Sequence, residues 1–159
     1  MKNIKAQEEG RYSFMGEFHY SVDDKGRVCL PNNFRSPEKT EIRRWIITKG
    51  LDRSLFLFPE TVWNTDVIPK IKNLTLTNAN HRIFTRLFFS PASEAELDSQ
   101  GRISIPQPLR LYAGITREAV LLGVMRRVEI WDKSLWVEYT EQQSRRYETV
   151  VSEIGDIGL

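Results

Sequence analysis

The sequence predicts an α+β fold, mainly β, in which two similar units follow one another along the chain. One observation is a motif, Asp-x-x-Gly-Arg followed by apolar-x-apolar-Pro, that occurs twice in the 159 residues. A second is that apolar residues alternate with polar ones around each motif, which is typical of strands. The third is a set of identities at one constant offset: Asp23, Gly26, Arg27, Pro31 and Arg35 recur as Asp98, Gly101, Arg102, Pro106 and Arg110.

Each copy of the motif predicts a strand, a tight corner, a second strand and a short helix. The glycine supplies the positive φ that such a corner needs, and the aspartate accepts backbone N–H groups within the turn. The proline fits the first position of a helix, where its missing donor is harmless. We therefore expect Asp23, Gly26, Asp98, Gly101 and Arg102 to form the turns.

The duplication extends beyond the motif, because a glycine, an apolar run and a tryptophan recur in the same order. These are Gly50, residues 55–58 and Trp63, then Gly123, residues 128–131 and Trp136. The second copy is slightly shorter between motif and tryptophan, which places the length change in a loop. Each repeat thus has short strands and a longer helix.

These patterns divide the chain into four parts. We expect a flexible N-terminal extension over residues 1–13, a first repeat over 14–76, a linker helix over 77–90, and a second repeat with a C-terminal helix over 91–154. Isolated repeats would leave strand edges and apolar faces without partners. We therefore expect the repeats to pack together and the chain to oligomerise.

Three helical segments are expected outside the motifs. Residues 59–77 are mostly helical, although Pro69 should end or kink the helix. A second helix over 78–90 carries apolar residues expected to pack between the repeats: Ile83, Phe84, Leu87, Phe88 and Phe89. The last helix begins near Asp132 as its N-cap. Its apolar stripe is more typical of a core or a subunit interface than of a ligand site: Leu135, Trp136, Tyr139 and Tyr147.

Composition argues against several functional classes. Cys29 is the single cysteine and there are two histidines, which excludes an intrachain disulfide and leaves no Cys/His cluster for zinc. The start of the chain lacks the apolar core of a signal peptide, and no run is long enough to span a bilayer. We expect a soluble, cytoplasmic protein with no metal, no cofactor and no membrane partner.

Catalytic chemistry has little support in the sequence. No Gly-rich phosphate loop, paired-histidine metal motif or Gly-x-Ser-x-Gly elbow occurs. His19 should face solvent beside Glu17 and Ser21, without an orienting partner for acid–base work. Cys29 lacks an assigned base and is replaced by Ser104 in the second copy. We therefore expect that the protein is not an enzyme.

The arginine after each corner has two interpretations. Arg27 could pair with Asp23 and brace the hairpin, as Arg102 would with Asp98. Alternatively, Arg27 and Lys25 could project from the corner toward phosphates or base edges, for which a guanidinium offers several fixed donors.

The two copies differ in charge on their first strands. The outward positions are His19 and Ser21 in the first copy and Glu94 and Glu96 in the second, and Lys25 is replaced by glutamine. Carboxylates repel a polyanion, so the first copy is the better candidate for DNA binding. The candidate DNA-binding residues are Lys25, Arg27, Arg35, Arg43 and Arg44, although an ordinary solvated surface is the simpler interpretation of Arg43 and Arg44.

The paired motifs resemble those of the MraZ family of bacterial transcription regulators, over nearly all of residues 14–140. Further similar segments stand at the expected places: residues 15–17, 88–90, 110–115 and 129–131, and Trp136. The resemblance implies tandem AbrB-like swapped-hairpin repeats with a double-psi-like β-barrel core. It also places the functional arginine of the family on Arg27, with Asp23, Lys25 and Gly26 in the same loop.

The resemblance further implies a function in transcription. Members bind tandem promoter repeats upstream of the division and cell-wall gene cluster, usually as repressors, and assemble into rings of about eight or more subunits. This protein is then expected to bind double-stranded DNA and to associate with the nucleoid. The alternative is a non-enzymatic oligomeric scaffold or protein-interaction module, which would not need Lys25 or Arg27 to be exposed.

Overall fold

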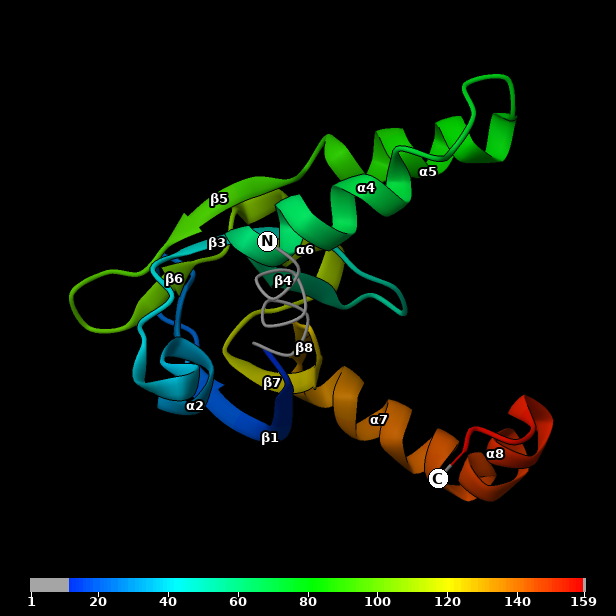
Figure 1. Ribbon diagram of the computed structural model, residues 1–159. Helices are drawn as coiled ribbons and strands as arrows, with labels where there is room; N and C mark the ends of the chain where they lie inside the picture. Colours follow the sequence, from blue (N-terminus) through cyan, green and yellow to red (C-terminus); the bar gives the residue numbers. More distant parts are fainter. Residues whose placement is uncertain (1–11, 159) are drawn as a thin grey trace.

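The computed structural model describes residues 12–158 and is built on a six-stranded antiparallel sheet in the order β1, β7, β8, β4, β3, β5 (Figure 1). The bounds of these strands are Phe14–Ser21 (β1), Arg44–Lys49 (β3), Leu55–Pro59 (β4), Ser93–Glu96 (β5), Glu118–Met125 (β7) and Arg127–Asp132 (β8). Two shorter strands, β2 (Arg27–Cys29) and β6 (Arg102–Ser104), pair with each other in a second sheet.

Strands of the two repeats are exchanged in the large sheet. β1 of the first repeat pairs with β7 of the second along its whole length, ending with Ser21 opposite Glu118. β5 of the second repeat pairs with β3 of the first, and β4 pairs with β8 at the centre. Within residues 12–158, β1 and β5 therefore pair with the other repeat instead of with the strand that follows them in the chain.

An approximate two-fold axis relates the two repeats. It passes between β4 and β8 in the large sheet, and between β2 and β6, where Val28 lies opposite Ile103. Both of these side chains are almost completely buried. The α+β architecture thus fits the predicted tandem pair of swapped hairpins around a double-psi-like barrel.

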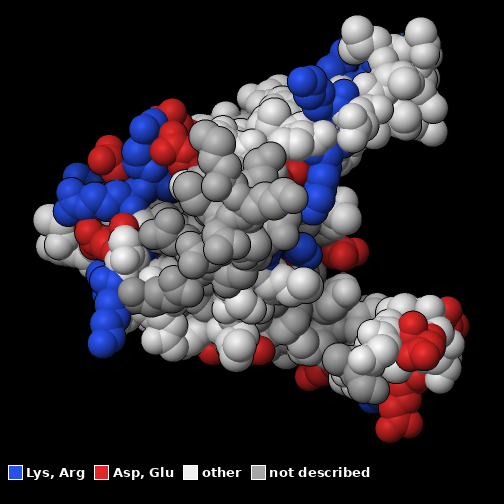
Figure 2. Space-filling model, viewed as in Figure 1, with Lys and Arg blue, Asp and Glu red and all other residues white. Residues whose placement is uncertain are grey.

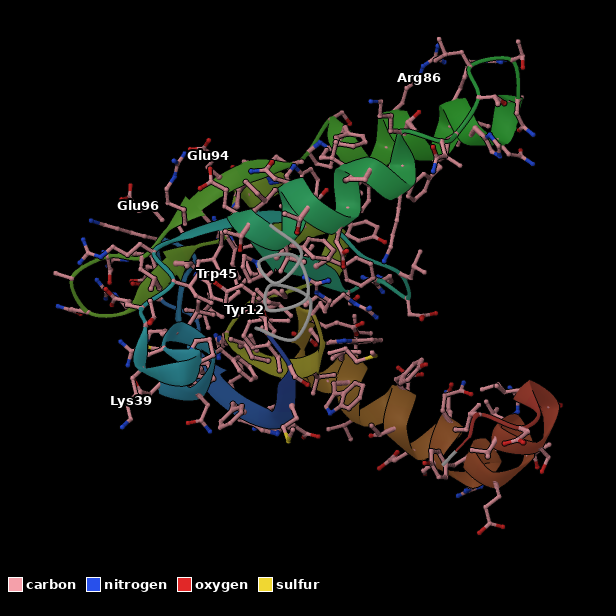
Figure 3. All side chains as sticks on the ribbon, in the orientation of Figure 1. Tyr12, Lys39, Trp45, Arg86, Glu94 and Glu96 are labelled. Carbon is pink, nitrogen blue, oxygen red and sulfur yellow. The ribbon has the colours of Figure 1, made fainter. Side chains whose placement is uncertain are left out.

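One apolar core serves both repeats. Trp45 lies in the interior (Figure 3), where its indole N–H donates to the Ile42 carbonyl at 2.9 Å. The first repeat contributes Phe14, Val28, Leu30, Phe34 and Leu57 to the same cluster, and the second contributes Ile103, Ile105, Leu109, Leu121 and Ile130. Burial of this core stabilises both repeats together, because neither repeat encloses it alone.

Two helical arms leave the barrel at the end opposite the β5–β6 corner (Figure 1). The first arm consists of α3 (Glu60–Val62), the π turn η2 (Trp63–Val67), α4 (Ile68–Ile71) and α5 (Ala79–Phe89). The second consists of α7 (Lys133–Gln143), η3 (Ser144–Arg146) and α8 (Tyr147–Ile154). The remaining short helices are α2 (Asn32–Arg35), η1 (Pro37–Lys39) and α6 (Gln107–Ala113).

The first arm differs from the predicted helix over residues 59–77. The helical segment ends at Ile71, and Pro69 lies in the first turn of α4, directly after the five-residue π turn. Proline lacks an N–H and crowds the preceding turn, so a wider turn before it relieves the conflict without ending the helix.

The apolar face of α5 also differs from expectation. Phe88 packs against Trp63, with ring centroids 5.6 Å apart, and Phe89 packs beside it. Ile83, Phe84 and Leu87 were predicted to lie between the repeats, but they are exposed in the single chain. Phe84 and Leu87 line an open pocket together with Lys49, Leu51 and Tyr112, so the other repeat borders them without covering them.

The helix boundaries are set by the expected side chains in two places. Asn78 and Asp132 cap α5 and α7 by accepting hydrogen bonds from backbone N–H groups of the first turn. Pro31 and Pro106 stand one position earlier than predicted, at the N-caps of α2 and α6. Most of the predicted N-terminal extension over residues 1–13 lies outside the described residues.

Candidate nucleic-acid interface

The first corner is closed by the carboxylate of Asp23. Its Oδ1 accepts hydrogen bonds from the backbone N–H groups of Lys25 (3.0 Å) and Arg27 (2.9 Å), and Oδ2 accepts from Arg27 Nε at 2.7 Å. Gly26, at φ +76°, lets the chain turn, and its N–H donates to the Asp23 carbonyl at 2.9 Å. The arrangement leaves the Lys25 side chain exposed at the tip.

The second corner repeats this geometry. Asp98 accepts from the backbone of Gln100 (2.8 Å) and Arg102 (2.9 Å), and from Arg102 Nε at 2.8 Å. In both corners the hydrogen bond from the arginine backbone N–H is the main cause that lowers the pKa of the aspartate, and the guanidinium adds to it. Both carboxylates are therefore ionised near neutral pH and hold their corners shut.

Arg27 braces the hairpin and retains further donors. Its Nε is committed to Asp23, but its side chain is 33% exposed. Within residues 12–158, its two Nη groups have no hydrogen-bond acceptor. The two interpretations of Arg27 are thus compatible, since one side of the guanidinium closes the corner and the other faces outward.

Each corner is covered by an arginine from the other repeat. The side chain of Arg110 lies over Gly26, where a Cβ atom would stand 2.5 Å from its Nε. Reciprocally, Arg35 lies over Gly101. The backbone is exchanged in the same way, since Ile105 donates to the Gly26 carbonyl at 2.9 Å. The structure therefore places Arg35 over the second corner, and Arg110 over the corner that carries Lys25 and Arg27.

Arg43 and Arg44 also lie beside the second repeat. The backbone carbonyl of Arg43 accepts from Leu97, immediately before the second corner, and its Nε pairs with Glu41 at 2.9 Å. This hydrogen bond raises the pKa of Arg43. Arg44 pairs with Glu60 at 3.1 Å and with Glu94 at 3.2 Å. The structure thus does not bring these two arginines together with Lys25 and Arg27.

Carboxylates offset the positive charge around the second corner. Glu94 and Glu96 project from β5, the strand that leads into this corner (Figure 3). Figure 2 shows basic and acidic side chains intermixed over this end of the molecule. At the corresponding positions on β1, His19 is exposed and hydrogen-bonded to Glu17 at 2.7 Å, as its solvent-facing placement predicted.

Arg117 is a basic residue of the first corner that sequence reasoning missed. Its carbonyl accepts the N–H of Val22 at 2.7 Å, one residue before Asp23. It thus occupies the place that Arg43 occupies at the second corner. The signal was present in the sequence only indirectly, because the strand exchange must be known before Arg117 can be assigned to the first corner.

Other chemistry-bearing residues do not converge in this region. Among residues 12–158, no three His, Cys, Asp or Glu side chains are grouped to hold a metal ion. Cys29 is partly buried in β2. No helix in the same part of the chain is long and apolar enough to cross a membrane.

Comparison with known proteins identifies relatives over most of the chain. The family model described as "MraZ protein, putative antitoxin-like" matches twice, over residues 13–87 and 88–153. A "Transcriptional regulator MraZ" of Moorella thermoacetica is 44% identical over 146 residues, which cover 92% of this chain and 99% of the relative. Proteins of the same name from Desulforamulus reducens and Syntrophomonas wolfei are 44% and 42% identical, over 91% and 92% of this chain and 99% of each relative.

Proposed function

The chain belongs to the MraZ family, and from this premise we propose that it is a transcriptional regulator that binds double-stranded DNA sequence-specifically through its first corner. Its relatives carry the name of transcriptional regulators, which supports the general function. The structure adds a reason to choose one corner over the other.

The observation that carries the proposal is the contrast between two corners of the same shape. Asp, Gly and Arg hold both loops in the same hydrogen-bonding pattern. The first loop carries Lys25 at its tip, whereas the second carries Gln100 and follows the carboxylates of β5. Within the loops, Lys25 is offset by Asp24, which is Ser99 in the second loop. The charge contrast therefore lies mainly in the strands that lead into the corners, and a polyanion favours β1, with His19 and Ser21, over β5, with Glu94 and Glu96.

The chemistry of the first corner suits a DNA groove. Lys25 offers a compact charge for phosphate, and the free edge of Arg27 offers paired donors of the kind that bind guanine O6 and N7. The Asp23 hydrogen bonds fix the Arg27 Nε and limit the freedom of the guanidinium. A preorganised donor loses less entropy on binding, which supports a role for Arg27 in reading sequence.

We further propose that the protein acts as a repressor of the division and cell-wall gene cluster, as a ring-shaped oligomer of about eight or more subunits on tandem promoter repeats. Exposed apolar side chains on both arms support self-assembly: Ile83, Phe84 and Leu87 on α5, and Tyr147, Val151 and Ile154 on α8. Such an assembly presents several first corners to successive DNA repeats, so weak contacts add up. A regulator of this kind is located in the cytoplasm, where it associates with the nucleoid.

The experiment that tests this function is fluorescence anisotropy with DNA from upstream of the protein's own gene and a scrambled control. We expect selective binding by the wild type and its loss in Arg27→Ala. The control at the other corner is Gln100→Ala, which removes an exposed side chain from the tip, leaves the backbone hydrogen bond to Asp98 in place and should keep selective binding. Lys25→Gln, which installs the residue of the second corner, should weaken binding to both DNAs.

Two results would contradict the proposal. If an intact wild-type oligomer, checked by light scattering, binds neither DNA, the scaffold alternative is favoured and Arg27 is only a brace. If Gln100→Ala and Arg27→Ala lose binding equally, the first corner has no special role.

A further inference from the structure

We infer that Arg117 of the second repeat contacts the DNA phosphate backbone beside the first corner, so that both repeats together form the DNA-binding surface. This inference rests on the proposed function, because it assigns a further contact to the same site. It follows from the strand exchange, from the charge around Arg117 and from its position relative to the corner tip.

The strand exchange places Arg117 at the first corner. β7 runs antiparallel to β1, with Glu118 opposite Ser21, and the Arg117 carbonyl continues this ladder by accepting from Val22. The backbone of Arg117 is therefore held one residue from Asp23, at the base of the loop that carries Lys25.

The charge around Arg117 leaves it available to a ligand. Its pseudo-symmetric counterpart, Arg43, is paired with Glu41. Arg117 is exposed, and among the described residues no carboxylate lies within 4.0 Å of its guanidinium. The adjacent Glu118 pairs with Lys133 instead, at 2.9 Å. The same position is thus neutralised at the second corner and unpaired at the first.

The position of Arg117 points to phosphate as its target. Lys25 stands at the tip of the corner, whereas Arg117 is set back at the base of the loop. When a corner enters a DNA groove, the strands that flank it lie beside the sugar–phosphate backbone at the wall of the groove. A cation at the base of the loop therefore adds affinity and fixes orientation without reading sequence.

The test compares Arg117→Ala with Arg43→Ala, which removes the same side chain from the other corner. Affinities for the upstream DNA and for scrambled DNA are measured at several salt concentrations. We expect Arg117→Ala to weaken binding to both DNAs by a similar factor, about five- to tenfold near 0.1 M salt. The slope of log K against log salt should become shallower by about 0.9 for each engaged chain. Arg43→Ala should leave the slope unchanged.

A conservative variant separates charge from structure. Arg117→Lys keeps a cation and should retain most of the wild-type slope, because phosphate accepts either charge. Thermal unfolding and light scattering of all variants establish that fold and assembly are intact. In the described part of the chain, no side-chain hydrogen bond or ion pair involves Arg117. The melting temperature and the oligomer size of its variants should therefore match those of the wild type.

The outcomes distinguish this inference from the proposed function. If Arg27→Ala abolishes selective binding while Arg117→Ala keeps wild-type affinity and slope, the inference is wrong and the proposed function stands. A loss confined to the upstream DNA would overturn the phosphate assignment. If the wild type binds neither DNA, the proposed function fails and the inference fails with it.

Discussion

Asp23 and Asp98 each organise a five-residue corner with one carboxylate. Each side chain accepts hydrogen bonds from two backbone N–H groups and from the guanidinium of its own corner, so the loop carries its own internal support. Asp23 also lies 3.7 Å from the guanidinium of Arg102. Asparagine could replace only part of this pattern, because its amide nitrogen donates where Oδ2 accepts. The ionised form is therefore the one that matches the corner.

Stability should depend on the protonation of these aspartates. Their pKa values are lowered in the folded protein from an ordinary value of 3.8. A lowered folded-state pKa stabilises the protein above the unfolded-state pKa, and this stabilisation is lost as pH falls through the folded-state value. We expect the free energy of unfolding to decrease below about pH 4.5, and to decrease less steeply in Asp98→Asn. Denaturant unfolding of the wild type and of Asp98→Asn between pH 2 and pH 7 measures both pH dependences. If the free energy of unfolding falls equally steeply in the two proteins, Asp98 does not contribute to the acid sensitivity.

The residues of the corners were predictable in part. The repeated spacing of Asp23, Gly26 and Arg27 was enough to predict a turn, because the interactions are local. The covering arginines could not be placed in the same way. Arg35 and Arg110 each cross to the opposite repeat, and nothing in their local sequence indicates which corner they reach.

At the scale of elements, α5 is attached to the sheet by a buried hydrogen bond. The hydroxyl of Thr48 on β3 donates to the carbonyl of Phe88, in the last turn of α5. Thr48 is completely buried, and the carbonyls of a last turn lack partners within their own helix. This bond joins the first arm to the barrel.

Replacing Thr48 with valine should therefore loosen the first arm. Valine keeps the shape but leaves the Phe88 carbonyl unpaired, which costs about 1–3 kcal/mol when the acceptor is buried. Urea unfolding measures this loss of stability. Amide hydrogen exchange should become faster in α5, with a smaller change in the barrel strands. Thr140→Val is the control, because its hydroxyl bonds only within α7 and its loss should cost less. Equal effects of the two substitutions would argue against a special role for Thr48.

Element boundaries were predictable where a cap or a breaker acts locally. Asp132 and Asn78 accept from the first turns of α7 and α5, so their sequence context was sufficient. Pro69 indicated a disturbance but not its form, since a helix can end, kink or widen at proline. The widened turn begins at Trp63, whose ring packs against Phe58 and Phe88, and such tertiary contacts are not visible in the local sequence.

At the scale of the whole molecule, the two repeats are interlocked. A count of motifs predicts two copies, but it does not predict that β1 pairs with β7 and β5 with β3. Hairpin and exchanged pairings satisfy the same alternation of apolar residues, so periodicity cannot separate them. The family resemblance supplied the swapped arrangement that the residues alone left open.

Interlocking predicts that neither repeat folds as a separate monomer. A chain divided between Ser90 and Pro91 would leave β1 and β5 without their partners, and would split the shared core. We expect each fragment to be unfolded or paired with a second copy of itself, and equimolar mixing to restore native circular dichroism and NMR spectra. A folded monomeric fragment, identified by light scattering and dispersed amide resonances, would contradict this view.

The covalent link between the exchanged repeats makes the barrel independent of dilution. Two separate chains that exchanged hairpins would dissociate at low protein concentration. Their association costs translational entropy, and this cost increases as the protein is diluted. Here the partner strand is always on the same chain, so each barrel stays closed even at a few copies per cell. Joining the two halves also lets them evolve apart, so that one corner can keep its lysine while the other carries glutamine.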